Sequence, residues 1–142
     1  MKVSTKWEGN LAFTMENPDG NQLKMDARNE AGGDGTGVSP MEAVLGGLAG
    51  CMGIDMYMIL KPYQDKLTRM EIETDGERND EAPKFFTAVE ITVHVDGDVP
   101  ASRVWRAVKL SDEKYCSVAN SLKADLSYKV ILNGEEVADE KK

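Results

Sequence analysis

The stretch Ser39–Met52, SPMEAVLGGLAGCM, indicates the start of a long helix and contains one of the two cysteines of the chain. Ser39 is a favourable N-cap residue, and Pro40 fits the first helical position. Glu42 stands three residues after the cap, which completes a capping box. The spacing predicts a helix from Pro40 to about Leu60, just before a Lys-Pro pair that ends it.

The composition of this helix indicates that it is buried. Its apolar side chains are not confined to one stripe, and a helix that is apolar nearly all round packs inside a core or a subunit interface; these side chains are Val44, Leu45, Leu48, Met52, Ile54, Met56, Met58 and Ile59. Each glycine in a helix interior costs about 1 kcal/mol relative to alanine. Gly46, Gly50 and Gly53 share a narrow sector, so they predict the close approach of another backbone, most simply a second copy of the same helix.

The segments around the helix alternate and turn like strands. They predict an α+β domain in which a sheet packs over one long central helix. Strands are expected over 2–8, 11–16, 22–26, 67–75, 85–95 and 125–132, and further helices over 100–110 and from Ser111 towards Lys123. A single domain is predicted for residues 1–142, with a frayed tail over 137–142.

The charge and composition exclude several classes of partner. The net charge is −8 and no basic patch is visible, which argues against nucleic acid. The chain shows neither a signal peptide nor a run of about 18 apolar residues, so we expect a cytoplasmic protein with no membrane partner. Its single histidine, His94, and the absence of C-x-x-C spacing predict no metal and no cofactor.

The two cysteines have two open interpretations, as small buried hydrophobic residues or as a reactive pair. Cys116 follows a helix-cap signal, and the start of a helix favours a thiolate. Asp55 lies four residues after Cys51 and can share its face of the helix. A carboxylate so close disfavours a thiolate, so this neighbour counts against a reactive Cys51.

Two elements of the sequence, SPMEAVLGGLAGC and SDEKYCSVANSL, resemble the OsmC/Ohr family of hydroperoxide-reducing thiol proteins over nearly the whole chain. The resemblance implies an OsmC-like fold with an antiparallel sheet wrapped over the central helix, in an intertwined homodimer with active sites at the interface. It implies that Cys51 attacks an organic hydroperoxide and that Cys116 resolves the sulfenic acid into a disulfide. A dithiol reductant would then restore the pair.

Two departures from the family pattern predict weak peroxidase activity. Met41 stands directly after Pro40, where the active peroxidases have a glutamate, and no arginine precedes Arg28. Two other functions therefore stay open. One is a non-catalytic dimeric module that binds a small apolar ligand at the subunit interface, and the other is a dimeric scaffold with two inert thiols.

Overall fold

A computed structural model describes residues 1–140, which form two compact units. The first unit is Met1–Val44, and the second begins at Leu45. The long helix α1 (Pro40–Ile59) starts in the first unit and continues into the second. A single domain over the whole chain stays a prediction, and the last two residues of the predicted frayed tail lie outside the described residues.

The first unit contains a three-stranded antiparallel sheet, as the turn signals predicted. Its strands, in the order β1-β2-β3, are β1 (Ser4–Gly9), β2 (Ala12–Glu16) and β3 (Gln22–Met25). Asp26 follows β3, is buried, and accepts hydrogen bonds from the Thr36 hydroxyl at 2.6 Å and the Thr36 amide at 3.1 Å. These bonds hold the pKa of Asp26 below its ordinary value. They also connect the glycine-rich loop over residues 29–38, which contains Thr36, to the end of β3.

Helix α1 begins with the capping box that the sequence predicts. The Ser39 amide donates to the Glu42 carboxylate at 2.8 Å, and the Glu42 amide donates to the Ser39 hydroxyl at 3.2 Å. Arg28 forms an ion pair with the same carboxylate at 3.5 Å. The hydrogen bonds from Ser39, helped by Arg28, hold the pKa of Glu42 below its ordinary value. The Glu42 carboxylate therefore serves the start of the helix.

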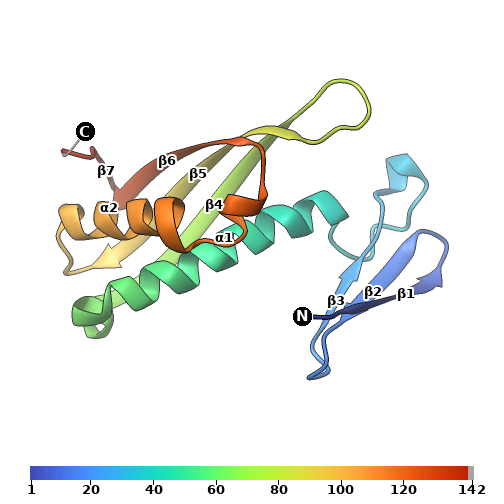
Figure 1. Ribbon diagram of the computed structural model, residues 1–142, viewed down its shortest axis with the longest axis horizontal. Helices are drawn as coiled ribbons and strands as arrows, with labels where there is room; N and C mark the ends of the chain where they lie inside the picture. Colours follow the sequence, from blue (N-terminus) through green and yellow to red (C-terminus); the bar gives the residue numbers. More distant parts are fainter. Residues whose placement is uncertain (141–142) are drawn as a thin grey trace. The chain divides into compact units, whose positions relative to one another are not determined.

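The second unit contains a four-stranded sheet in the order β4-β5-β6-β7 (Figure 1). The strands are β4 (Leu67–Arg78), β5 (Phe86–Gly97), β6 (Asp125–Leu132) and β7 (Glu135–Val137). The neighbours β5 and β6 are parallel, because helix α2 (Ala101–Leu110) connects them, and the other pairs are antiparallel. The α+β class predicted from the sequence is confirmed, with a mixed second sheet.

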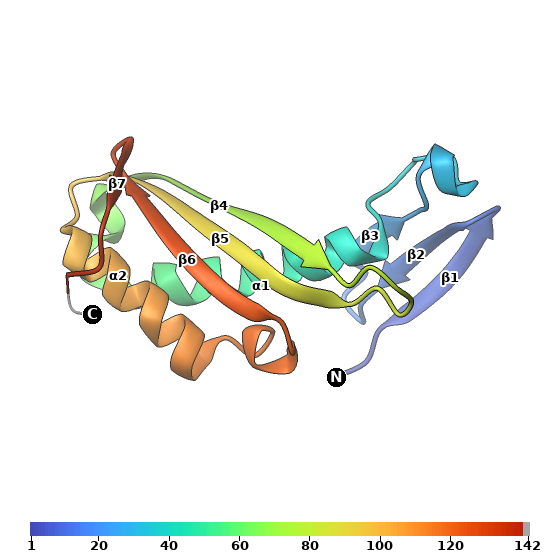
Figure 2. The same ribbon diagram turned by 90° about the horizontal axis from the view of Figure 1, so that it is seen from above.

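Both helices of the second unit lie on one face of this sheet (Figures 1 and 2). The period-two pattern places alternate residues of β5 in the core, as the sequence predicted. A Cβ at Gly53 would lie 3.4 Å from Cδ1 of Ile72, so α1 packs closely on β4 there. The fully buried side chains under the sheet are Leu48, Met52, Met56, Val89, Ile91, Val93, Val95, Val104, Val108 and Val130.

Among the helices described in residues 1–140, only α1 is long and apolar enough to cross a membrane, judged by its length and composition. The sequence analysis expected no such segment. The buried helix of a folded core passes the same test. Leu48, Met52 and Met56 are buried and Gly53 packs on β4, so one face of α1 lies in the core, although only 17% of its membrane-length window is buried in the single chain.

The prediction of a helix from Ser111 towards Lys123, with Cys116 near its start, is wrong. The chain continues α2 through Ser111, whose backbone is helical (φ −61°, ψ −50°), into a five-residue π-helical turn, Ser111–Tyr115. Cys116 ends this turn with extended backbone, and only a short 3₁₀ turn, Ala119–Ser121, follows. Ser111 was read as a helix cap, but its hydroxyl donates to Asp55 instead.

Residues 135–139 are tied to the rest of the fold, although the sequence predicted a frayed tail from residue 137. Asn133 and Gly134 have positive φ angles (51° and 83°) and make the tight turn from β6 into β7. The Trp105 indole donates to the Val137 carbonyl at 2.9 Å, and Lys109 forms an ion pair with Asp139. These contacts hold residues 135–139 against α2.

Candidate functional site

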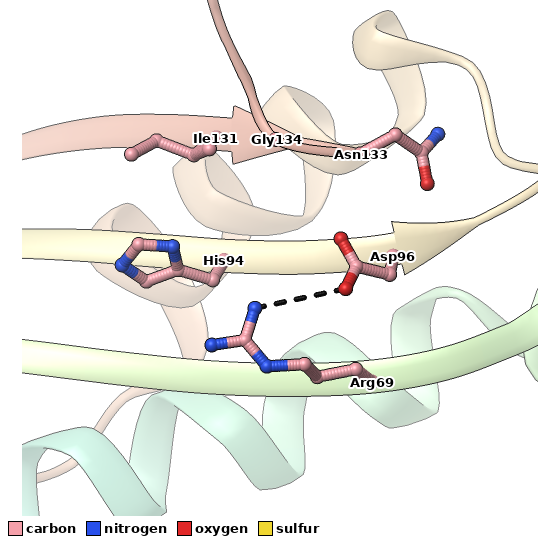
Figure 3. Close-up of a pocket in the computed structure, with 6 residues that line it drawn as sticks. All are labelled: Arg69, His94, Asp96, Ile131, Asn133 and Gly134. Carbon is pink, nitrogen blue, oxygen red and sulfur yellow. Dashed lines mark ion pairs between the residues drawn. The ribbon is translucent and has the colours of Figure 1, made fainter.

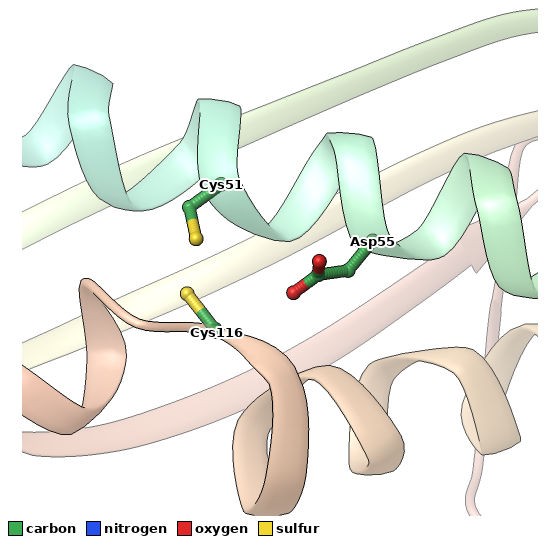
Figure 4. A group of neighbouring side chains, drawn as sticks. All are labelled: Cys51, Asp55 and Cys116. Atoms are coloured by element: carbon green, nitrogen blue, oxygen red, sulfur yellow. The ribbon is translucent and has the colours of Figure 1, made fainter.

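Cys51 and Cys116 face each other between α1 and the segment that follows α2 (Figure 4). Their sulfur atoms and a carboxylate oxygen of Asp55 all lie within 4.8 Å of one another. Both thiols are free. A disulfide requires an S–S distance of about 2.05 Å, so the sulfur atoms would have to approach by at most about 3 Å. The fold therefore brings together the two thiols that the sequence analysis selected.

The two thiols differ in exposure. Cys51 is half-buried, whereas Cys116 is 0% exposed. The Ala119 amide donates to the Cys116 sulfur at 3.3 Å, and the amide of Cys116 donates to the Ser111 carbonyl at 2.7 Å across the π turn. Of the two thiol residues, Cys51 therefore retains exposed surface and Cys116 does not.

The expected thiolate at Cys116 is not supported by its surroundings. Burial raises the pKa of Cys116 to about 11, and its contact with Cys51 acts in the same direction. The hydrogen bond from the Ala119 amide opposes this rise but is the smaller effect. The helix start that would have favoured a thiolate does not exist, so Cys116 is a neutral thiol at pH 7.

Asp55 is fixed by one hydrogen bond. The Ser111 hydroxyl donates to its Oδ2 atom at 3.0 Å, and Ser111 is completely buried. Within residues 1–140 no basic side chain pairs with this carboxylate. Its second oxygen stays available beside the two sulfur atoms, as the view in Figure 4 shows.

The π turn that carries Cys116 is held from two sides. The Asn120 side chain donates to the Cys116 carbonyl at 2.8 Å, and the Tyr128 hydroxyl donates to the Asp112 carboxylate. Burial and the bond to Asp112 both raise the pKa of Tyr128, so its hydroxyl stays protonated and remains a donor. These bonds fix the backbone that positions the buried thiol.

The sequence identified Cys51 and Cys116, and the i, i+4 spacing placed Asp55 near Cys51. It missed Ser111 as a partner of Asp55, because a serine before two acidic residues is also a typical helix cap. No sequence signal identified Tyr128, since an alternating strand pattern says only which face a side chain occupies.

A second concave region lies on the outer face of the sheet, away from the thiols (Figure 3). It has a volume of about 460 Å³ and is lined by Arg69, His94, Asp96, Ile131, Asn133 and Gly134. Its charged groups satisfy one another: Arg69 lies 3.6 Å from Asp96 and 2.5 Å from Glu71, and His94 pairs with Glu73. His94 is thus a strand residue hydrogen-bonded to Glu73, and none of the lining residues is a cysteine.

Known proteins resemble the chain in sequence and in fold. The family model for OsmC-like proteins matches residues 33–130. Protein YhfA of Escherichia coli K12 is 38% identical over 136 residues, which cover 92% of this chain and 98% of YhfA. A hypothetical protein from Aquifex aeolicus has a crystal structure with a TM-score of 0.75 and 29% identity, over 92% of this chain and 96% of its own.

A more distant structure shares the fold alone. It is an organic hydroperoxide resistance protein OsmC from Legionella pneumophila, with a TM-score of 0.62 and 17% identity over 93% of this chain and 96% of its own. The family resemblance read from the two cysteine-containing segments is therefore confirmed, together with the fold it implied. The chain belongs to the OsmC-like protein family.

Proposed function

We propose that this protein is a cytoplasmic thiol-dependent peroxidase that reduces organic hydroperoxides with Cys51 and Cys116. The observation that carries the proposal is the pairing of a half-buried and a fully buried thiol within 4.8 Å. A two-cysteine peroxidase needs one accessible sulfur for the peroxide and one nearby sulfur that reacts afterwards. The difference in exposure supports attack by Cys51 and resolution by Cys116.

The reaction would proceed in two steps. The Cys51 thiolate attacks one oxygen of the peroxide, the O–O bond breaks, and the remaining alkoxide takes a proton and leaves as an alcohol. Cys51 is thereby oxidised to a sulfenic acid. The Cys116 thiol then loses its proton as its sulfur attacks the Cys51 sulfur, the S–O bond breaks, and the hydroxide leaves with that proton as water. A dithiol reductant reverses the disulfide by thiol–disulfide exchange.

The substrate class is supported by family membership and not by the side chains around the thiols. Leu48, Met52 and Met56, which lie within five residues of Cys51 on α1, are core residues beneath the sheet. The OsmC protein of Legionella pneumophila, which shares the fold, is an organic hydroperoxide resistance protein. We include the homodimer of the sequence analysis in this proposal, since α1 leaves apolar side chains exposed, including Ile54 and Met58.

Stopped-flow oxidation of the reduced protein tests the proposal. Cumene hydroperoxide should oxidise it faster than it oxidises free cysteine, and faster than H₂O₂ oxidises the protein, with one intramolecular disulfide formed per chain. Cys116→Ser should retain the first step and accumulate a sulfenic acid that dimedone traps at Cys51. Cys51→Ser, the matched variant of the other thiol, should lose the fast reaction.

Two results would overturn the proposal. The first is a rate no faster than that of free cysteine with both peroxides. The second is the same fast rate in Cys51→Ser as in the unmodified chain. If oxidation is slow and an apolar ligand co-purifies with the protein, the binding module of the sequence analysis is favoured. Slow oxidation without such a ligand favours the inert scaffold.

A further inference from the structure

The three donor atoms at the thiol site have the chemistry of a metal site. Two thiols and one carboxylate converge from separate parts of the chain, with Cys51 and Asp55 one turn apart on α1 and Cys116 on the π turn. A tetrahedral zinc ion holds sulfur ligands at about 2.3 Å, which puts two such sulfurs about 3.8 Å apart. The observed limit of 4.8 Å is within about 1 Å of that spacing.

The surroundings of Asp55 supply a second observation. Ser111 Oγ, fully buried, donates to one carboxylate oxygen at 3.0 Å and leaves the other oxygen beside the sulfur atoms. Ligating carboxylates in metal sites are typically oriented by such an outer hydrogen bond. No basic side chain in the described part of the chain neutralises Asp55, so a cation at this position meets no competing charge.

From this geometry we propose that the reduced protein binds one Zn²⁺ ion through Cys51, Asp55 and Cys116, with water in the fourth position. Thiolate ligands select zinc over magnesium or calcium, which prefer oxygen. Binding converts two thiols and Zn²⁺ into two zinc-bound thiolates and releases two protons, so the site carries a net charge of −1. The two cysteines are distant in sequence and the fold brings them together. The site therefore has no C-x-x-C spacing by which the sequence could indicate it.

The zinc-bound and disulfide states exclude each other, since both use the same two sulfur atoms. Zinc would therefore protect the thiols from peroxide and from alkylation, and oxidation would release it. The inference shares residues with the proposed peroxidase but does not depend on peroxide turnover.

Cobalt(II) substitution tests the site directly. The reduced, chelator-treated full chain is titrated with Co²⁺, and a thiolate-to-cobalt charge-transfer band with tetrahedral d–d bands should saturate at one ion per chain. Zn²⁺ should displace the cobalt and release about two protons per ion, measured by titration calorimetry in buffers of different ionisation enthalpy. Zn²⁺ should also slow alkylation of both thiols.

Three variants test the ligands, a fourth tests the outer hydrogen bond, and a fifth is the control. Cys51→Ser and Cys116→Ser should each lose the charge-transfer intensity of one thiolate and the tight binding, and Asp55→Asn should weaken Zn²⁺ binding. Ser111→Ala, which removes only the outer hydrogen bond, should weaken it by about 10-fold. Asp98→Asn, the same change at an exposed carboxylate outside the site, should leave the affinity unchanged. Circular dichroism confirms that each variant is folded.

The proposal is overturned if Co²⁺ binds without a charge-transfer band, or if Asp98→Asn and Asp55→Asn have the same affinity. It is also overturned if the folded, reduced chain binds no metal at micromolar concentration. These outcomes are separate from peroxidase activity. A protein that forms the disulfide rapidly but binds no Co²⁺ keeps the proposed function, and one that binds Co²⁺ but reacts slowly with peroxide keeps only the zinc site.

Discussion

Burial gives the two thiols different chemistry at the scale of single residues. Cys116 has no exposed surface, and burial raises its pKa to about 11. In the unfolded chain the same thiol ionises near its ordinary value of 9.0. The folded state therefore holds the Cys116 proton more tightly, and the stabilisation from the neutral thiol is complete below pH 9. It decreases as the pH rises from about 9 through about 11.

This shift predicts the alkylation profile of Cys116. In the Cys51→Ser variant, where Cys116 is the remaining thiol and its burial is retained, the rate of iodoacetamide modification should keep rising at pH values above 9. The same variant unfolded in urea should reach its plateau near the ordinary pKa of 9.0, which provides the matched control. Equal profiles in the folded and unfolded chain would contradict the burial that the structure assigns to this sulfur.

The functional thiols could be selected from the sequence, but their environments could not. The family motifs identified Cys51 and Cys116, and helical spacing placed Asp55 near Cys51. The burial of Cys116 depends on segments distant in sequence, and its neighbours Cys51 and Tyr128 come from α1 and β6. Ser111 hydrogen-bonds Asp55 across 56 positions of sequence, and no local pattern carries that information.

At the scale of elements, the start of α1 is determined by local hydrogen bonds. Ser39→Ala removes the hydroxyl that accepts from the Glu42 amide at 3.2 Å, so the free energy of unfolding should fall by about 1 kcal/mol. Urea denaturation at fixed protein concentration measures this change. Ser39→Asp retains a capping acceptor and should stay close to the unmodified chain, whereas equal losses in both variants would rule out the capping role.

The hydrogen bonds to Glu42 add a dependence on pH. They hold the pKa of Glu42 below its ordinary value, so their contribution is present above that value and is lost as the pH falls through the lowered pKa. Ser39→Ala retains the bond from the Ser39 amide but loses the part contributed by the Ser39 hydroxyl, so the difference in stability between this variant and the unmodified chain should shrink in acid. A difference that stays constant from neutral pH down to pH 3 would contradict this coupling.

Elements with a regular period were predictable, and the irregular one was not. The capping box and the Lys-Pro pair located α1 to within a residue, and alternation located β4, β5 and β6 to within three residues at each end. The π turn Ser111–Tyr115 was missed because it inserts one residue into a helix without any preferred composition. Because of this turn, Cys116 follows a continuation of α2, where the sequence predicted the start of a new helix.

At the scale of the whole molecule, the role predicted for the α1 glycines, the close approach of another backbone, requires a second chain. A Cβ built at Gly46, Gly47 or Gly50 meets no heavy atom within 4 Å, so the single chain does not require glycine there. Gly53 is different, since it packs on Ile72 of the same chain. The fold of one chain followed from pattern and family motifs, whereas its assembly depends on a partner surface that one sequence does not display.

The exposed face of α1 predicts a homodimer that a single charge should dissociate. Ile54 and Met58 lie four residues apart on α1 and are 65% and 66% exposed in the single chain, which is unusual for large apolar side chains on a core helix. Size-exclusion chromatography with light scattering should give twice the mass of one chain. Ile54→Arg should give the mass of one chain, because an unpaired charge in an apolar interface is strongly unfavourable.

Ile131→Arg makes the same change on the outer face of the sheet and should remain dimeric. A monomeric unmodified chain, or an Ile54→Arg variant that stays dimeric, would leave the three open glycines without a role in assembly and would place any dimer contact elsewhere on the molecule.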